Sequence, residues 1–437
     1  MDSGINGSAA RSQLLDLLGG SVMKRRHFMH SIMGTTLLSS LRAQASTTTE
    51  PRFIFVFCPG GWDPTRVFAP EFDNPNVAME FDAFAADFGD LRMVSNPNRP
   101  SVDAFFTQHA ADTLILNGVQ VRSIAHEICT LIALSGSTSG RDPDWATRLA
   151  GYATADYPIP HLNLSGPALA GNDAALIART GSNSQLDMLL SGEITNYSDI
   201  QPSSLSAESL NLIDQYVGAR GNGRMYSAGT GRDLLLSEAF VRAHDSAEAL
   251  KEHRRRIDFQ SSTQLSSQVE LAVNVLRNGF SRCVSMAYAG SGLGWDSHAD
   301  NDTAQAGLFE GLFSGLLSLK SALDSTLDTN GQLLSESTYV VVASEMGRTP
   351  MLNATQGKDH WPFTSMMLWG PRLRGGLTLG GLDAGYQGRR VDLSTGEFSN
   401  SGQLLNIESV GAALLKLADV DPASVLPDAP AFDGIFQ

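Results

Sequence analysis

The chain has 437 residues, 42% of them hydrophobic and 18% charged, which is the composition of a globular protein and not of a disordered one. That length suffices for one large domain or for two ordinary ones. The formal net charge of −15 argues against a nucleic-acid partner, because binding to phosphates requires clustered Lys and Arg.

The N-terminal segment has the pattern of a twin-arginine export signal. Arg25 and Arg26 are followed by the aromatic Phe28, and a short, weakly apolar stretch then covers residues 32–41. Ala43-Gln44-Ala45 places small residues where a signal peptidase cleaves. The apolar stretch is too short and too rich in Ser, Thr and Gly to span a bilayer, so no stable membrane span is expected.

This pattern divides the chain into two parts. Residues 1–45 are expected to be an N-terminal extension plus the signal peptide, with either Met1 or Met23 as the start. The partner of this part is the twin-arginine export machinery, which moves folded proteins. Residues 46–437 form the mature chain, for which we expect a periplasmic or secreted location.

Five apolar runs are typical of strands that are buried on both faces. Stretches between several of them carry apolar residues at helical spacing. Strands that alternate with helices predict an α/β fold with a mostly parallel central sheet and helices on both faces. The strand-like runs are residues 52–58, 113–117, 283–288, 338–343 and 365–369, and the helical stretches are residues 125–134, 265–277 and 308–323.

Residues 172–262 differ from their surroundings. They are polar and rich in Ser, Asn and Gly, with helical patterns at residues 206–216 and 238–257. We interpret this segment as a largely helical insertion or cap on the α/β core.

The cysteines are few and odd in number. Cys58, Cys129 and Cys283 each lie in an apolar stretch. They therefore predict buried free thiols and no disulfide framework.

Carboxylates and histidines follow several of the predicted strands, which is where ligands gather in open parallel sheets. Asp, Glu and His together are the ligand set of divalent ions such as zinc, manganese, magnesium or calcium. Taken singly, Asp63 is equally well explained as a turn or cap residue and Asp296-Ser297-His298 as a polar loop, and Asp359-His360 is a weaker signal still. Their convergence at one edge of the sheet predicts a metal site. The residues concerned are Asp63, His126, Asp296, His298, Glu345 and His360.

In their order along the chain, these residues resemble a bacterial family called domain of unknown function 1501. The most specific part is Ser344-Glu345-Met346-Gly347-Arg348-Thr349-Pro350, followed by Asn353 and by Gly357-Lys358-Asp359-His360. The family pattern has Phe where this chain has Met346. The resemblance covers most of residues 52–420, and the family is grouped with the alkaline phosphatase-like superfamily, which includes sulfatases and phosphopentomutases.

The resemblance implies an alkaline phosphatase-like fold with two divalent metal ions. In that superfamily an Asp after the first strand, an acidic residue after a late strand and a distal His hold the metals. The matching positions here are Asp63, Glu345 and His360. Asp296 and His298 are left for the remaining metal position.

The resemblance leaves the catalytic groups open. The superfamily nucleophile is a Ser, Thr or modified Cys at the start of a helix, but Ala125 stands directly before His126 here. Ser123 is a substitute two residues before Ala125. His126 is either a metal ligand or a general acid/base, and Arg348 either holds a substrate oxyanion or braces Glu345.

Two functions follow from the resemblance. The first is an exported metal-dependent hydrolase that acts on a small anionic substrate, a phosphate or sulfate ester. The alternative is a non-catalytic exported metal-binding or assembly protein of the same fold, which the missing hydroxyl before His126 would favour.

Overall fold

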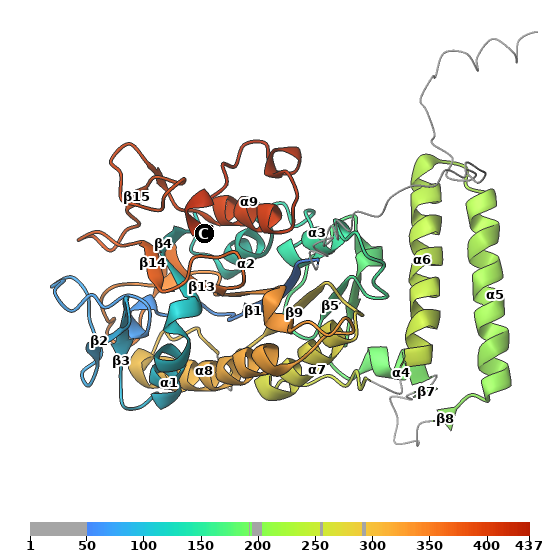
Figure 1. The fold of residues 1–437 in the computed structure, drawn as a ribbon, viewed down its shortest axis with the longest axis horizontal. Coiled ribbons are helices and arrows are strands. Elements are labelled where there is room, and N and C mark those ends of the chain that lie inside the picture. The colour runs from blue at the N-terminus through green and yellow to red at the C-terminus, as the bar shows by residue number, and fades with distance from the viewer. Residues whose placement is uncertain (1–49, 192, 195–202, 254–256, 291–293) are drawn as a thin grey trace, which may run out of the picture. The chain divides into compact units, whose positions relative to one another are not determined.

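The computed structural model describes residues 50–191, 193–194, 203–253, 257–290 and 294–437 (Figure 1). The predicted signal peptide, residues 1–45, lies outside this part of the chain. None of the described helices is both long and apolar enough to cross a membrane.

An eight-stranded sheet forms the centre of the fold, in the order β14-β4-β13-β10-β1-β9-β5-β6. Five of the seven neighbouring pairs are parallel, and only β13 runs against both of its neighbours. The predicted α/β class with a mostly parallel sheet is therefore confirmed. The strands are β1 (Arg52–Phe57), β4 (Thr113–Gln120), β5 (His161–Asn163), β6 (Ile177–Arg179), β9 (Cys283–Ala287), β10 (Thr338–Ala343), β13 (Phe363–Trp369) and β14 (Leu377–Gly380).

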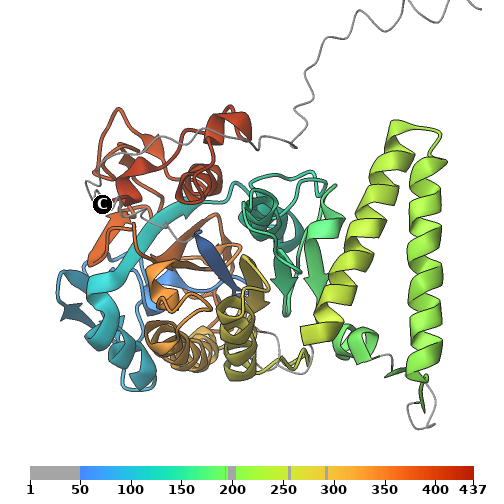
Figure 2. The ribbon, with the colours of Figure 1, turned by 45° about the vertical axis from the view of Figure 1, so that its right-hand side comes forward.

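Helices cover both faces of this sheet (Figures 1 and 2). Successive residues of a strand point to opposite faces, so Ile54 of β1 packs into one apolar core and its neighbour Phe53 into another. The first core is completed by α1 (Pro100–His109), α7 (Leu265–Arg277) and α8 (Asn301–Ser325). The second is completed by α2 (His126–Ser135), α3 (Trp145–Gly151) and α9 (Ile407–Leu417).

The segment after β6 is largely helical. It contains α4 (Gln185–Ser191), the short strands β7 (Glu193–Ile194) and β8 (Ser203–Ser204), α5 (Ala207–Tyr226) and α6 (Gly231–His253). Helices α5 and α6 pack against each other as a hairpin (Figure 1). The edge strand β6 also falls within residues 172–262, and the boundaries expected for the insertion stay a prediction.

Besides the β7–β8 pair, three small two-stranded sheets lie outside the central one. They pair β2 (Phe84–Phe88) with β3 (Leu91–Ser95), β11 (Gly347–Arg348) with β12 (His360–Trp361), and β15 (Arg390–Val391) with β16 (Gln403–Leu404). The β11–β12 pair matters for the site, because it places Arg348 directly opposite His360. All three cysteines are buried and free, as predicted.

Candidate metal centre

The site lies at the edge of the sheet where the central strands β1, β9 and β10 have their carboxyl ends. In the parallel register, Phe57 of β1 lies beside Ala343 of β10 and Ala287 of β9, so the loops that follow begin at the same edge. The loops approach closely at Gly60, whose φ is 121°. A Cβ there would lie only 2.7 Å from the backbone nitrogen of Asp296, which leaves glycine as the fitting residue.

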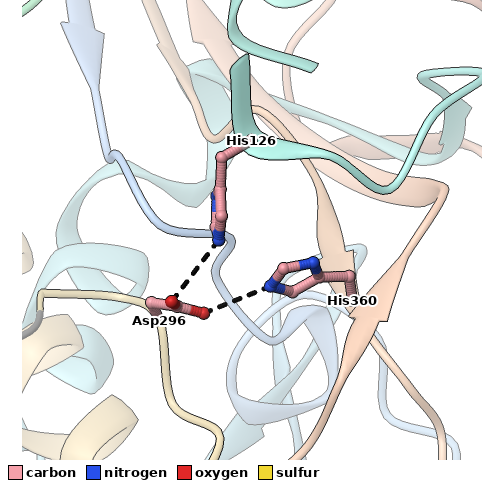
Figure 3. A group of neighbouring side chains, drawn as sticks. All are labelled: His126, Asp296 and His360. Carbon is pink, nitrogen blue, oxygen red and sulfur yellow. Dashed lines mark hydrogen bonds and ion pairs between the residues drawn. The ribbon is translucent and has the colours of Figure 1, made fainter. Parts of the chain in front are cut away.

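Four side chains converge at this edge. His126, Asp296 and His360 each offer a ligand atom within 4.8 Å of the others, and Figure 3 shows them pointing toward one another. The Nε2 atom of His360 lies 3.3 Å from Oδ1 of Asp296, and that of His126 lies 3.4 Å from Oδ2. His298 joins them, with its Nε2 3.1 Å from Oδ1 of Asp296 and 2.9 Å from Nε2 of His360.

An oxygen acceptor holds the other ring nitrogen of each histidine. The Nδ1 atoms of His298 and His126 lie 2.8 Å and 3.0 Å from the carboxylates of Asp359 and Glu345. The Nδ1 atom of His360 lies 2.7 Å from the backbone oxygen of Ile124. Because these oxygens accept, each neutral ring keeps its proton on Nδ1 and a lone pair on Nε2.

Three nitrogen lone pairs and a carboxylate therefore face the same point. The Nε2 atoms of His298 and His360, which are 2.9 Å apart, would repel each other unless a proton or a cation lay between them. The Nε2 atom of His126 is buried and has no hydrogen-bond partner among the described residues. Imidazole nitrogens backed by carboxylate or carbonyl acceptors, together with one carboxylate, fit a divalent metal ion.

Arg348 holds Asp296 in place. Its buried guanidinium donates to Oδ1 of Asp296 at 2.7 Å and to backbone oxygens that include those of Gly61 and Trp295. Partial burial raises the pKa of Asp296, but the hydrogen bond and charge of Arg348 outweigh it and lower the pKa overall. The buried Arg348 thus contacts Asp296, and the two roles expected for it, holding a substrate oxyanion or bracing Glu345, stay predictions.

Glu345 lies behind His126. Its side chain is 2% exposed, and its Oε1 accepts hydrogen bonds from His126 and from the backbone nitrogen of Gly60. The hydrogen bond to Glu345 raises the pKa of His126, against the opposing effect of burial. Glu345, which the resemblance assigned to metal, thus orients one of the clustered histidines.

Asp63 lies in a buried ion pair. Its Oδ2 is 2.9 Å from Nζ of Lys358, and its Oδ1 accepts from the backbone and hydroxyl of Thr65. Burial raises the pKa of Asp63, but the charges of Lys358 and Arg66 outweigh it and hold the pKa well below its usual range. The protein therefore supplies the cations for this carboxylate itself.

Ser123 stabilises the turn before α2. Its Oγ accepts a hydrogen bond of 3.2 Å from the backbone nitrogen of Ala125. A catalytic role for Ser123 stays a prediction. His126, the first residue of α2, contacts Asp296 in the cluster, whereas the hydrogen bond of Ser123 lies within the turn before α2.

Sequence reasoning missed two participants in the segment 357–360. Asp359 orients His298, and Lys358 neutralises Asp63. The adjacency of Asp359 to His360 was a signal for the first, because metal-binding histidines are commonly backed by carboxylates. Nothing in the sequence paired Lys358 with a residue so distant in the chain.

A second group of potential ligands, Asp214, His244 and Glu248, lies between α5 and α6. Lys251 places its Nζ 2.6 Å from Asp214 and 2.7 Å from Glu248. The ammonium group occupies the place that a metal ion would take, so we do not consider this group a metal site.

Comparison with solved structures finds distant similarities. A protein crystallised in complex with k-i-k-neocarrahexaose shares 10% identity, with 85% of this chain and 72% of that chain covered, at a TM-score of 0.40. A sulfatase from Pseudoalteromonas sp. shares 9% over 85% and 68%, at 0.35. A protein in the alkaline phosphatase superfamily from Vibrio parahaemolyticus shares 9% over 85% and 67%, at 0.30. The chain thus has a distant structural similarity to sulfatases and the alkaline phosphatase superfamily.

The family comparison is more specific. The model described as protein of unknown function (DUF1501) matches residues 235–398, which include Asp296, His298, Arg348 and His360. The family resemblance is confirmed over that segment. No curated protein matches the sequence.

Proposed function

We propose that this protein binds one divalent metal ion through His126, Asp296, His298 and His360 and is a metal-dependent hydrolase of phosphate or sulfate esters. The observation that carries the proposal is the set of three imidazoles whose Nδ1 atoms are held by acceptors and whose Nε2 atoms face Asp296. We assign one metal ion, where the resemblance implied two, because Lys358 and Arg66 neutralise Asp63.

The proposed ligand set restricts which metal ion we expect. Three imidazole nitrogens and one carboxylate oxygen favour zinc or another first-row transition ion over magnesium and calcium, which prefer all-oxygen sites. A bound ion of this kind supplies Lewis acidity, which polarises an ester oxygen and makes water more acidic.

The remaining roles fall to residues around the ligands. Arg348 fixes the orientation of Asp296, Glu345 fixes that of His126, and Asp359 fixes that of His298. The side chains of His298 and Asp296 are 46% and 34% exposed, which leaves the centre accessible to substrate and water. Because Ser123 is engaged with the turn before α2, we assign the attack on the ester to water.

A specific observation favours the second candidate, a non-catalytic metal-binding or assembly protein. His126, Asp296, His298 and His360 would together supply four protein ligands, the number that structural zinc sites have. A catalytic site of this kind must instead expand its coordination or release a ligand. His298 is the most exposed of the four and would be the one to move.

The export route belongs to the same proposal. Arg25-Arg26 supports passage of the folded, metal-loaded chain through the twin-arginine machinery to a periplasmic or secreted location. Replacing both arginines by lysine should retain the protein in the cytoplasm, as fractionation would show. Export of that variant at the normal level would contradict the proposal.

Metal analysis combined with a panel of arylphosphates and arylsulfates tests the function. The purified protein should contain about one metal ion per chain, and Asp296→Asn, which keeps the hydrogen bond to Arg348, should contain none. Turnover that is lost in Asp296→Asn would support the hydrolase, and one metal ion without turnover would favour the non-catalytic protein. A wild-type chain without metal would contradict both. His244→Gln, in the group that Lys251 fills, is the matched control.

A further inference from the structure

The outer side of α5 presents large apolar side chains to solvent. Leu212 and Tyr216 are 62% and 63% exposed, and Ile213 is 47% exposed. The opposite side of the helix packs on α6, where a Cβ at Gly221 would meet Phe240 at 3.1 Å. Helix α5 therefore packs on α6 along one side and keeps its apolar outer side uncovered.

Charged residues extend this outer side into an oblique row. Side chains four residues apart are neighbours on a helix, and a row of them is inclined to the helix axis and winds partly around it. The row, which we call the α5 ridge, consists of Glu208, Leu212, Tyr216, Arg220 and Arg224, all exposed. It is acidic at its start, apolar in its middle and basic at its end.

The charged residues at the two ends of the α5 ridge, Glu208 and Arg224, are free to pair with a partner. Within the described part of the chain, neither Glu208 nor Arg224 forms an ion pair. Arg220 donates to the hydroxyl of Tyr216 at 2.8 Å, which keeps both side chains on the ridge. When this row is laid antiparallel on a copy of itself about Tyr216, its ends are complementary, because Glu208 falls opposite Arg224, and Leu212 falls opposite Arg220.

From this pattern we infer that α5 is the contact surface for a second copy of this chain, packed antiparallel about a two-fold axis at Tyr216. Tyr216 then meets its own equivalent, and Glu208 of each copy faces Arg224 of the other, because both lie eight residues from Tyr216. A two-fold contact requires a surface of this self-complementary kind. The two α5–α6 hairpins together form a four-helix arrangement.

The area that α5 can bury determines how stable we expect the dimer to be. Standard stable interfaces bury about 800 Å² per partner. A single helix of 20 residues, roughly 30 Å long, offers less than that, so we expect a reversible dimer whose population rises with concentration.

Sedimentation velocity of the purified protein across a concentration series is the first test. The wild type should shift from monomer to dimer, and Tyr216→Glu should remain monomeric. Phe81→Glu is the control, because Phe81 is 96% exposed but lies outside α5. Circular dichroism should show the same helix content in all three. A wild type that is monomeric throughout, or a dimer that Tyr216→Glu does not weaken, would overturn the inference.

Charge reversal tests the direction of packing. Glu208→Arg and Arg224→Glu should each weaken the dimer by placing like charges opposite each other, and the double variant should restore it. An unrestored double variant would exclude the antiparallel register.

A disulfide trap tests the position of the axis. Tyr216→Cys should oxidise to a covalent dimer, since the three natural cysteines are buried, whereas Phe81→Cys should not. Equal cross-linking of the two variants would also exclude the axis at Tyr216.

Discussion

Two carboxylates at the same edge of the sheet, Asp63 and Asp296, are in opposite situations. Asp63 follows β1, is fully buried and pairs with the ammonium group of Lys358. Asp296 follows β9, is partly exposed and faces three imidazole nitrogens that carry lone pairs. Both carboxylates contact a protein cation, Asp63 that of Lys358 and Asp296 that of Arg348, but Asp296 also faces the imidazole nitrogens and solvent.

Exchanging each carboxylate for its amide is the most direct way to break this comparison. Asp296→Asn removes the only carboxylate of the cluster, so bound metal should fall from about one ion per chain to background. Asp63→Asn should keep the metal wherever the variant remains folded. Elemental analysis of both variants checks this, and loss of metal from Asp63→Asn alone would reverse the assignment.

Removal of Lys358 should have the next largest effect. Lys358→Met leaves Asp63 buried beside Arg66 without its closest cation, and loss of one partner from a buried pair costs about 3–5 kcal/mol of unfolding free energy. Denaturant unfolding measures the loss. The double variant Asp63→Asn/Lys358→Met should recover most of it, and a double variant as unstable as the single one would show that the pair is not the cause.

The buried histidine outside the cluster gives a pH test. His161 is fully buried between the hydroxyls of Thr147 and Ser285, and burial lowers its pKa to about 4. Its unfolded form binds a proton near pH 6.5, so the unfolding free energy should fall by up to about 3 kcal/mol as the pH decreases from 6.5 to 4. Urea unfolding across this range checks it, and His161→Gln should lack that part of the slope. An unchanged slope in His161→Gln would assign it to other groups.

The smallest effect is expected from a residue that contacts a proposed metal ligand and does not itself bind the metal. Asp359→Asn weakens the acceptor that holds Nδ1 of His298, and such changes typically cost about 10–100-fold in metal affinity. Metal titration against a chelator measures this. Asp300→Asn is the matched control. Asp300 lies two residues after His298, at the start of α8, and its side chain makes no cap hydrogen bond there. Equal losses in both variants would show a general charge effect.

Much of the site could be predicted from sequence because strand ends are visible as ends of apolar runs. Asp296, His298 and His360 were identified in this way, and the structure brings them together with His126, whose role was left open. Glu345 was expected at the metal and stands behind His126, because a carboxylate that follows a strand can point to either side of a loop.

By itself, the sequence determined the layered α/β class, since alternating apolar runs and helical periods leave few other ways to bury both kinds of surface. It did not show that β13 runs antiparallel, because an apolar run carries no direction. The tertiary structure alone decided which carboxylate faces the histidines. Asp63 and Lys358 lie far apart in the chain, and only packing brings the lysine close to Asp63 and leaves Asp296 to the histidines.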